Sequence, residues 1–173
     1  MVSAHIEALV REVPNFPKPG IVFRDITPLL REPKAFAEII DVMSEFARKQ
    51  SAEIVAAPES RGFIFAAAVA LRAGIGFVPI RKPGKLPWKT RGASYALEYG
   101  TDRLEIHEDA IRSGQRVLLV DDVLATGGTM KACCDLVTEM EAKIAGIAFL
   151  IELAALGGRK RLGDVPMHSV LTF

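Results

Sequence analysis

Cysteine and histidine are scarce in this chain. Two of its 173 residues are cysteines and three are histidines. Cys133 and Cys134 are adjacent, and adjacent side chains on a helix point about 100° apart, so the two thiols are poorly placed to share a metal. His5, His107 and His168 have no Cys, Asp or Glu partner at ligand spacing. We therefore expect no metal site built from protein side chains, and thiols packed in the core of a protein from a reducing compartment.

Long hydrophobic runs and an excess of charge of one sign are also absent. The most apolar run, Gly62–Leu71, lies between two arginines and is too short to span a bilayer. Charged residues such as Glu7 interrupt the N-terminal segment, so no secretory signal is expected there. The net charge is +1, which gives no general attraction to nucleic acid or to an anionic membrane. These observations predict a cytoplasmic protein without nucleic-acid or membrane partners.

The apolar pattern predicts alternating strands and helices. Helical spacing predicts helices over residues 3–13 and 33–49, and residues 21–26 favour a short strand. Further strands are expected over 53–57, 77–80, 95–99, 103–107, 117–120, 146–153 and 167–172, and further helices over 63–73, 130–141 and 159–163. This order predicts one α/β domain over residues 1–173, a parallel sheet with helices on both faces. Residues 95–107 would form a β-hairpin.

The most informative segment is Arg116–Met130. Its apolar run, Val117–Val120, is typical of a buried parallel strand, and Asp121 and Asp122 follow where we expect that strand to end. A loop rich in glycine and hydroxyl groups then enters a helix, whose N-terminal amides favour an anion. The loop residues are Ala125, Thr126, Gly127, Gly128 and Thr129. Two acids beside an anion site suit a phosphorylated sugar, although an ordinary strand-to-helix turn is the simpler alternative.

Two other polar turns follow predicted strands. In the first, Ser60 would cap the next helix and Arg61 could grip a diphosphate bidentately, or be merely exposed. The second is the basic cluster Arg81–Lys85, a charge clamp or an ordinary solvated loop. Trp88 lies in the same long loop and could cover a site or contact a partner subunit. Ligands of such sheets bind beyond the carboxyl ends of the strands, where all three turns should meet.

Four motifs resemble the adenine branch of the type I phosphoribosyltransferases. They are Asp-Asp followed by Ala-Thr-Gly-Gly-Thr, Pro58-Glu59-Ser60-Arg61-Gly62, Leu97-Glu98-Tyr99-Gly100, and the Phe-Pro-rich segment from Phe16 to Ile26. They occur in the family's order and span most of the chain. The resemblance implies the type I phosphoribosyltransferase fold, with an N-terminal helix and a small base-binding hood (1–32) and a mobile hairpin lid (81–107). It also implies a cis peptide at Glu59–Ser60.

The resemblance further implies a pentosyltransferase of purine salvage. Such an enzyme converts adenine and phosphoribosyl diphosphate into AMP and diphosphate, with Mg²⁺ bound mainly by the substrate. Asp121 and Asp122 would hold the ribose and, through water, the metal, and the 125–129 loop would cradle the 5′-phosphate. The cations expected at the diphosphate are Arg61, Lys82 and Lys85, together with Ser60.

The same resemblance assigns the base site and the lid. Phe23 would stack on the purine while the backbones of Val22 and Arg24 read its edge. Glu98 would manage the purine proton, a role that suits a positioned carboxylate, and Tyr99 would pack nearby or close over the sugar. The resemblance implies a homodimer in which a basic residue such as Arg81 reaches the neighbouring site.

Two rival functions remain open on the sequence. The first is a phosphoribosyltransferase for hypoxanthine, guanine, xanthine or orotate, against which the hood and the Leu-Glu-Tyr segment argue. The second is a binding-only regulator similar to the purine repressors. Such regulators carry a DNA-binding domain, whereas only a short predicted helix precedes the hood here.

Overall fold

A five-stranded parallel sheet forms the centre of the molecule, as the sequence predicts. The computed structural model describes residues 4–96 and 101–173. The strand order is β4-β3-β7-β8-β9, and every neighbouring pair is parallel. The strands are β3 (Ile54–Pro58), β4 (Gly76–Ile80), β7 (Arg116–Leu124), β8 (Lys143–Glu152) and β9 (Met167–Thr172).

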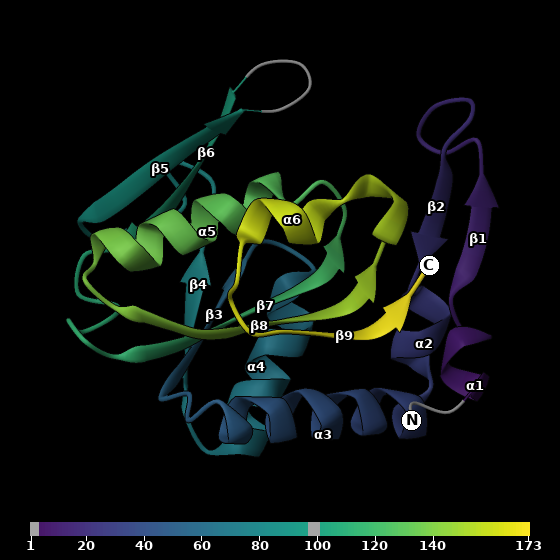
Figure 1. The fold of residues 1–173 in the computed structure, drawn as a ribbon, viewed down its shortest axis with the longest axis horizontal. Coiled ribbons are helices and arrows are strands. Elements are labelled where there is room, and N and C mark those ends of the chain that lie inside the picture. Colours follow the sequence, from purple (N-terminus) through teal and green to yellow (C-terminus); the bar gives the residue numbers. More distant parts are fainter. Residues whose placement is uncertain (1–3, 97–100) are drawn as a thin grey trace.

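Helices cover both faces of this sheet, which confirms the predicted α/β architecture. Helices α3 (Pro33–Lys49) and α4 (Gly62–Ala73) lie on one face, and α5 (Gly128–Glu139) and α6 (Gly158–Leu162) on the other (Figure 1). The α3 bounds match the prediction because Pro33 starts the helix and its apolar stripe faces the sheet.

The central strand β7 supplies both cores. Leu118 and Val120 pack into the core on the α3 and α4 side, whereas Val117 and Leu119 pack into the core on the α5 side. This alternation explains why the run is continuously apolar, since both faces of a parallel strand are covered. All four side chains are 0% exposed, so β7 is a rigid support for the residues that follow.

The N-terminal segment differs from the predicted helix over residues 3–13. Helix α1 spans only Ala4–Glu7, and β1 (Arg11–Pro14) pairs antiparallel with β2 (Val22–Asp25). The pairing partners lie about ten residues downstream, so their hydrogen bonds override the local helical spacing. A short helix α2 (Thr27–Arg31), which the apolar pattern did not predict, leads into α3.

A hairpin lies at the opposite end of the sheet from the β1–β2 pair (Figure 1). Its strands are β5 (Thr90–Ala96) and β6 (Thr101–His107), and Thr90 pairs with His107. The hairpin is confirmed, but β5 starts before the predicted residue 95 because β6 is long enough to pair with the preceding residues. A one-turn 3₁₀ helix, η1 (Ala154–Leu156), joins β8 to α6.

Two further expectations concern the cysteines and membranes. Cys133 and Cys134 are both buried and free, as core thiols should be. Burial raises the pKa of the Cys134 thiol to about 12, so this thiol stays protonated and unreactive near neutral pH. None of the helices in residues 4–96 and 101–173 is long and apolar enough to cross a membrane.

Candidate active site

A cleft of about 560 Å³ lies where β2 faces the carboxyl ends of β3 and β7. It brings together most of the predicted site residues from three separate segments. The lining residues are Ile21, Val22, Phe23, Arg24, Glu59, Ser60, Arg61, Asp121, Asp122, Val123, Ala125, Thr129 and Leu153. A smaller cavity of about 90 Å³ adjoins it over the 125–129 loop, with Thr126, Gly127 and Gly128 in its wall. The hood, the turn after β3, the acid pair and the 125–129 loop therefore share one site.

The two acids belong to β7 and do not mark its end. The prediction that the strand stops at Val120 is wrong, because pairing with β8 continues through Leu124. The Asp122 amide donates a hydrogen bond of 2.9 Å to Asp121 Oδ1. Burial, followed by the like charge of Asp122, raises the pKa of Asp121 well above its usual value. A site with two close carboxylates favours a positively charged ligand centre.

Arg61 connects the turn after β3 to the acid pair. Its Nε lies 2.6 Å from Asp122 Oδ2, and its guanidinium carbon lies 5.5 Å from the centre of the Phe23 ring. The Glu59–Ser60 peptide bond is cis, as expected. Ser60 is not the helix cap, because α4 begins at Gly62 and Arg61 occupies the N-cap position without a side-chain hydrogen bond.

The 125–129 loop packs directly on the start of α6. Gly127 has a φ of 79°, which favours glycine, and α5 begins at Gly128, earlier than predicted. A Cβ on Gly127 would lie 2.7 Å from the carbonyl oxygen of Gly158. Glycine is therefore needed at both Gly127 and Gly158 for the loop and α6 to approach each other. The loop leads into the 12-residue helix α5, whose N-terminal amides suit a phosphate.

The hood places its aromatic ring over the cleft beside Arg61. Phe23 packs edge-on against Phe16, with ring centroids 5.2 Å apart. Arg24 is held by an ion pair with Glu12 and by the ring of Phe173, whose centre is 4.2 Å from the guanidinium carbon. These contacts fix the backbone that flanks the Phe23 ring.

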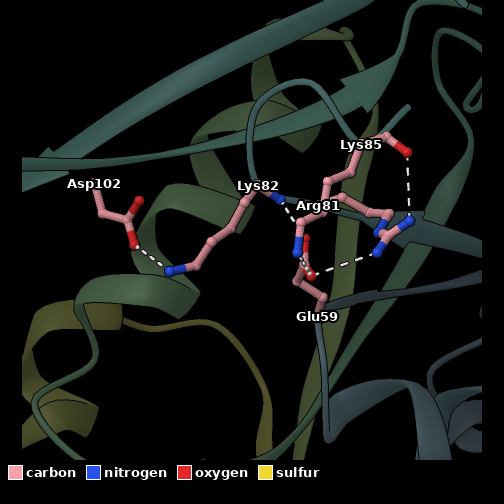
Figure 2. Close-up of polar contacts among 5 residues, drawn as sticks. All are labelled: Glu59, Arg81, Lys82, Lys85 and Asp102. Carbon is pink, nitrogen blue, oxygen red and sulfur yellow. Dashed lines mark hydrogen bonds and ion pairs between the residues drawn. The ribbon is translucent and has the colours of Figure 1, made fainter. Parts of the chain in front are cut away.

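The two lysines expected at the diphosphate do not line the cleft. Figure 2 shows Lys85 turned toward Glu59, with 2.9 Å between Nζ and Oε2, and Lys82 turned toward Asp102, with 3.2 Å between Nζ and Oδ2. Arg81 also faces Glu59. The basic loop thus lies beside the site with its cations paired to carboxylates.

Several lining residues were not predicted. Ile21, Val123 and Leu153 add apolar walls, and Glu59 adds a carboxylate. Glu59 stands inside the Pro58–Gly62 motif, yet its role depends on contacts with a distant loop. Glu98 and Tyr99 lie outside the described residues, so their predicted roles rest on the sequence.

No group of three or more His, Cys, Asp or Glu side chains that could hold a metal occurs in residues 4–96 and 101–173. The cleft does contain the two carboxylates Asp121 and Asp122. Mg²⁺ in phosphoryl-group sites is typically bound by one or two carboxylates together with substrate phosphates and waters. The donor set therefore fits a magnesium ion that arrives with its substrate.

Comparison with known families gives a match over most of the chain. Residues 25–170 match the family model described as the phosphoribosyl transferase domain. This span includes the acid pair, the 125–129 loop and the Arg61 turn. The chain belongs to the phosphoribosyltransferase family.

Relatives within this family carry a narrower name. The chain is 57% identical over 164 residues to an adenine phosphoribosyltransferase of Symbiobacterium thermophilum, covering 95% of this chain and 96% of the relative. It is 51% identical to the Thermotoga maritima adenine phosphoribosyltransferase over the full length of both. It therefore falls in the adenine branch of the phosphoribosyltransferases.

Solved phosphoribosyltransferase structures agree with the fold. The crystal structure of the Thermoanaerobacter pseudethanolicus adenine phosphoribosyltransferase superposes with a TM-score of 0.94 at 50% identity, covering 98% of each chain. The Saccharomyces cerevisiae enzyme, complexed with an imino-altritol bisphosphate and adenine, gives 0.93 at 38% identity, again covering 98% of each chain. The type I phosphoribosyltransferase fold is thus confirmed.

Proposed function

We infer that this chain is a pentosyltransferase that transfers the 5-phosphoribosyl group from phosphoribosyl diphosphate to adenine, giving AMP and diphosphate in purine salvage. The observation that carries this inference is the single cleft shared by Phe23, Arg61, the acid pair and the phosphate loop. Each has the chemistry that one part of the two substrates requires. Full-length relatives named adenine phosphoribosyltransferase support the same reaction.

The base would bind beneath the hood. The Phe23 ring offers a stacking face, and the backbones of Val22 and Arg24 offer a donor and an acceptor to the purine edge. Adenine presents an amino donor and a ring-nitrogen acceptor there, and hypoxanthine and guanine reverse both. A fixed backbone pair would therefore reject those bases by leaving buried polar groups unpaired.

The phosphoribosyl group would lie along β7 and the loop after it. Asp121 and Asp122 hold the ribose hydroxyls, and their negative charge favours the cationic sugar that forms as the anomeric bond to diphosphate breaks. The loop from Ala125 to Thr129 binds the 5′-phosphate with backbone amides and hydroxyls. Ser60 and Arg61 bind the departing diphosphate from the wall of the cleft, and Lys82 and Lys85 would join them by turning from Asp102 and Glu59.

The magnesium ion would be bound mainly by phosphoribosyl diphosphate in this cleft. Asp121 and Asp122 would contact it through water, and the ion would neutralise charge on the diphosphate. The remaining chemistry belongs to the protein. The 81–107 segment acts as a lid that excludes water from the activated sugar, with Tyr99 over the site and Glu98 accepting the purine proton.

The assembly is proposed to be a homodimer in the cytoplasm. The residues Ile64 and Leu71 on α4 are 40% and 85% exposed, an apolar surface that supports self-association. Arg81 faces Glu59 of its own chain, so any reach across the dimer would require it to leave that contact. Mass measurement in solution tests the dimer.

The reaction itself is tested by following AMP formation from adenine, magnesium and phosphoribosyl diphosphate. Turnover establishes the proposed function. Tight binding of phosphoribosyl diphosphate without turnover of adenine, hypoxanthine, guanine, xanthine or orotate would contradict it and indicate a binding-only regulator.

A further inference from the structure

Glu59 stands between the cleft and the basic loop. It lines the cleft immediately before Ser60 and Arg61, yet its carboxylate points to the loop that follows β4 (Figure 2). Glu59 Oε1 accepts a 2.6 Å hydrogen bond from the Lys82 amide, and Oε2 accepts one of 2.9 Å from Lys85 Nζ. Arg81 Nη2 lies 3.5 Å from Oε2.

The backbone of the same residue makes a further connection. The Glu59 amide donates a 2.9 Å hydrogen bond to the carbonyl of Ile80, the last residue of β4. The turn after β3 and the loop after β4 are therefore joined by both the main chain and the side chain of one residue. Arg81 also donates to the Lys85 carbonyl at 3.3 Å, which closes the loop on itself.

The carboxylate is largely removed from water, because the Glu59 side chain is only 10% exposed. Burial alone would favour the protonated acid. The hydrogen bonds from Lys82 and Lys85 and the charge of Arg81 outweigh that effect, so the pKa of Glu59 lies below its usual value. Glu59 is thus an anion at neutral pH, and its partners are held by charge-assisted contacts.

We propose that Glu59 is a positioning residue for diphosphate, which holds the Arg81–Lys85 loop against the cleft so that its cations and amides are in place beside Arg61. The inference rests on the proposed function, because it assigns the diphosphate to this turn. A loop that is already in place loses less conformational freedom when the ligand binds, so Glu59 should strengthen the affinity for diphosphate. The purine would bind under the hood, so the affinity for adenine should not change when Glu59 is replaced.

The test compares three variants at one position with a matched control. Glu59→Gln keeps an oxygen for the Lys82 amide but loses the charge that holds Lys85 and Arg81, whereas Glu59→Ala loses both. Glu59→Asp keeps the charge. The control is Glu53→Gln near the opposite end of β3, where Glu53 Oε2 likewise accepts a backbone amide, that of Arg116, at 2.7 Å.

The main readout is the Kd of magnesium diphosphate, measured by calorimetry, with the KM values of both substrates beside it. We expect Glu59→Gln to weaken diphosphate binding by about tenfold, Glu59→Asp to weaken it less, and Glu53→Gln to leave it unchanged. KM for phosphoribosyl diphosphate should rise in parallel while KM for adenine stays within about twofold. Exchange of the Lys82 amide should accelerate in Glu59→Ala more than in Glu59→Gln.

Unchanged or tighter diphosphate binding in Glu59→Gln would overturn the inference. Unchanged binding would mean that the Glu59 carboxylate has no effect on diphosphate, and tighter binding would mean that it competes with diphosphate for the cations. A parallel loss of adenine affinity and thermal stability would also overturn it, because the role would be general and structural. A wild type whose diphosphate affinity depends on Glu59 as predicted, but which forms no AMP, would remove the proposed function alone. A wild type that binds no diphosphate would overturn both the proposed function and the role of Glu59.

Discussion

Arg61 Nε lies 2.6 Å from Asp122 Oδ2, so a cation proposed for the diphosphate is ion-paired to an acid proposed for the ribose. The Asp122 side chain is 7% exposed and the Arg61 side chain 46%. The pair therefore links the interior of the sheet to the open cleft. A guanidinium has five N–H donors, so Arg61 keeps donors for a ligand while it remains anchored.

The double variant Asp121→Asn with Asp122→Asn should reduce turnover to background and leave the circular dichroism spectrum unchanged. Neutral amides keep the shape of the site but cannot favour a cationic sugar. Asp41→Asn is the matched control, because Asp41 forms an ion pair of the same 2.6 Å length with Arg72, away from the cleft. Wild-type turnover in the double variant would show that the ribose assignment is wrong.

Asp121 should make the protein less stable as pH rises. Its carboxyl ionises near 3.8 without these surroundings, and burial together with Asp122 raises that pKa in the folded protein. Above 3.8 the unfolded state loses this proton first, so the free energy of unfolding falls as pH rises until the folded pKa is passed. Asp121→Asn should therefore melt at a higher temperature than wild type at pH about 7, with a gap that narrows toward pH about 4. Scanning fluorimetry across this pH range measures both melting temperatures. A difference between them that is constant with pH, or a variant that melts below wild type, would contradict the raised pKa of Asp121.

Gly62→Ala should impair both folding and activity. A Cβ at this position would lie 2.9 Å from Asp121 Oδ1 and 3.2 Å from the Val120 carbonyl oxygen. We expect a loss of about 1–3 kcal/mol in the free energy of unfolding, with reduced turnover as Asp121 is displaced. Gly76→Ala is the control, because its Cβ would meet only Ile54 at 3.7 Å or more. Equal denaturation midpoints for the two variants would refute the close approach.

Gly158→Ala should weaken binding of the 5′-phosphate selectively. Its Cβ would overlap the Ala125 carbonyl oxygen, so the phosphate loop would have to move away from α6. We expect affinity for ribose 5-phosphate to fall about tenfold or more while affinity for magnesium diphosphate is kept. Titration calorimetry with both ligands separates these effects. Equal losses for the two would mean that the whole cleft had been distorted.

Glu98→Gln should lower kcat by about 10² to 10⁴, the usual range for general acid–base catalysis. Binding of phosphoribosyl diphosphate should stay close to wild type, since the proton to be managed belongs to the purine. Single-turnover kinetics distinguish the chemical step from product release. Unaltered kcat would remove Glu98 from the mechanism.

The sequence predicts the parts of this fold that depend on local pattern. Helix α3 and the core of β7 follow from apolar spacing that matches their burial. The helix predicted over 3–13 failed because β1 is stabilised by β2, through pairs such as Val13 with Phe23. The same reason extends β5 to Thr90, opposite His107. Strand pairing between distant residues is invisible to a local pattern.

The candidate site was likewise predictable only where a local motif marks its residues. Motifs indicated Phe23, Arg61 and the acid pair, and the structure gathers them in one cleft. The pattern could not indicate that Lys85 would be held by Glu59, because the two are 26 residues apart in sequence. Nor could it indicate the packing of Gly158 on the phosphate loop. Contacts of this kind are properties of the assembled fold.

The adenine assignment is tested most directly by the ratio of kcat/KM for adenine to that for hypoxanthine or guanine, with magnesium phosphoribosyl diphosphate held constant. A hood that reads the purine edge with fixed backbone groups predicts a preference for adenine of about 10⁴ or more. A ratio near or below one would contradict the adenine assignment and the role of Val22, Phe23 and Arg24, although the phosphoribosyl site would stand.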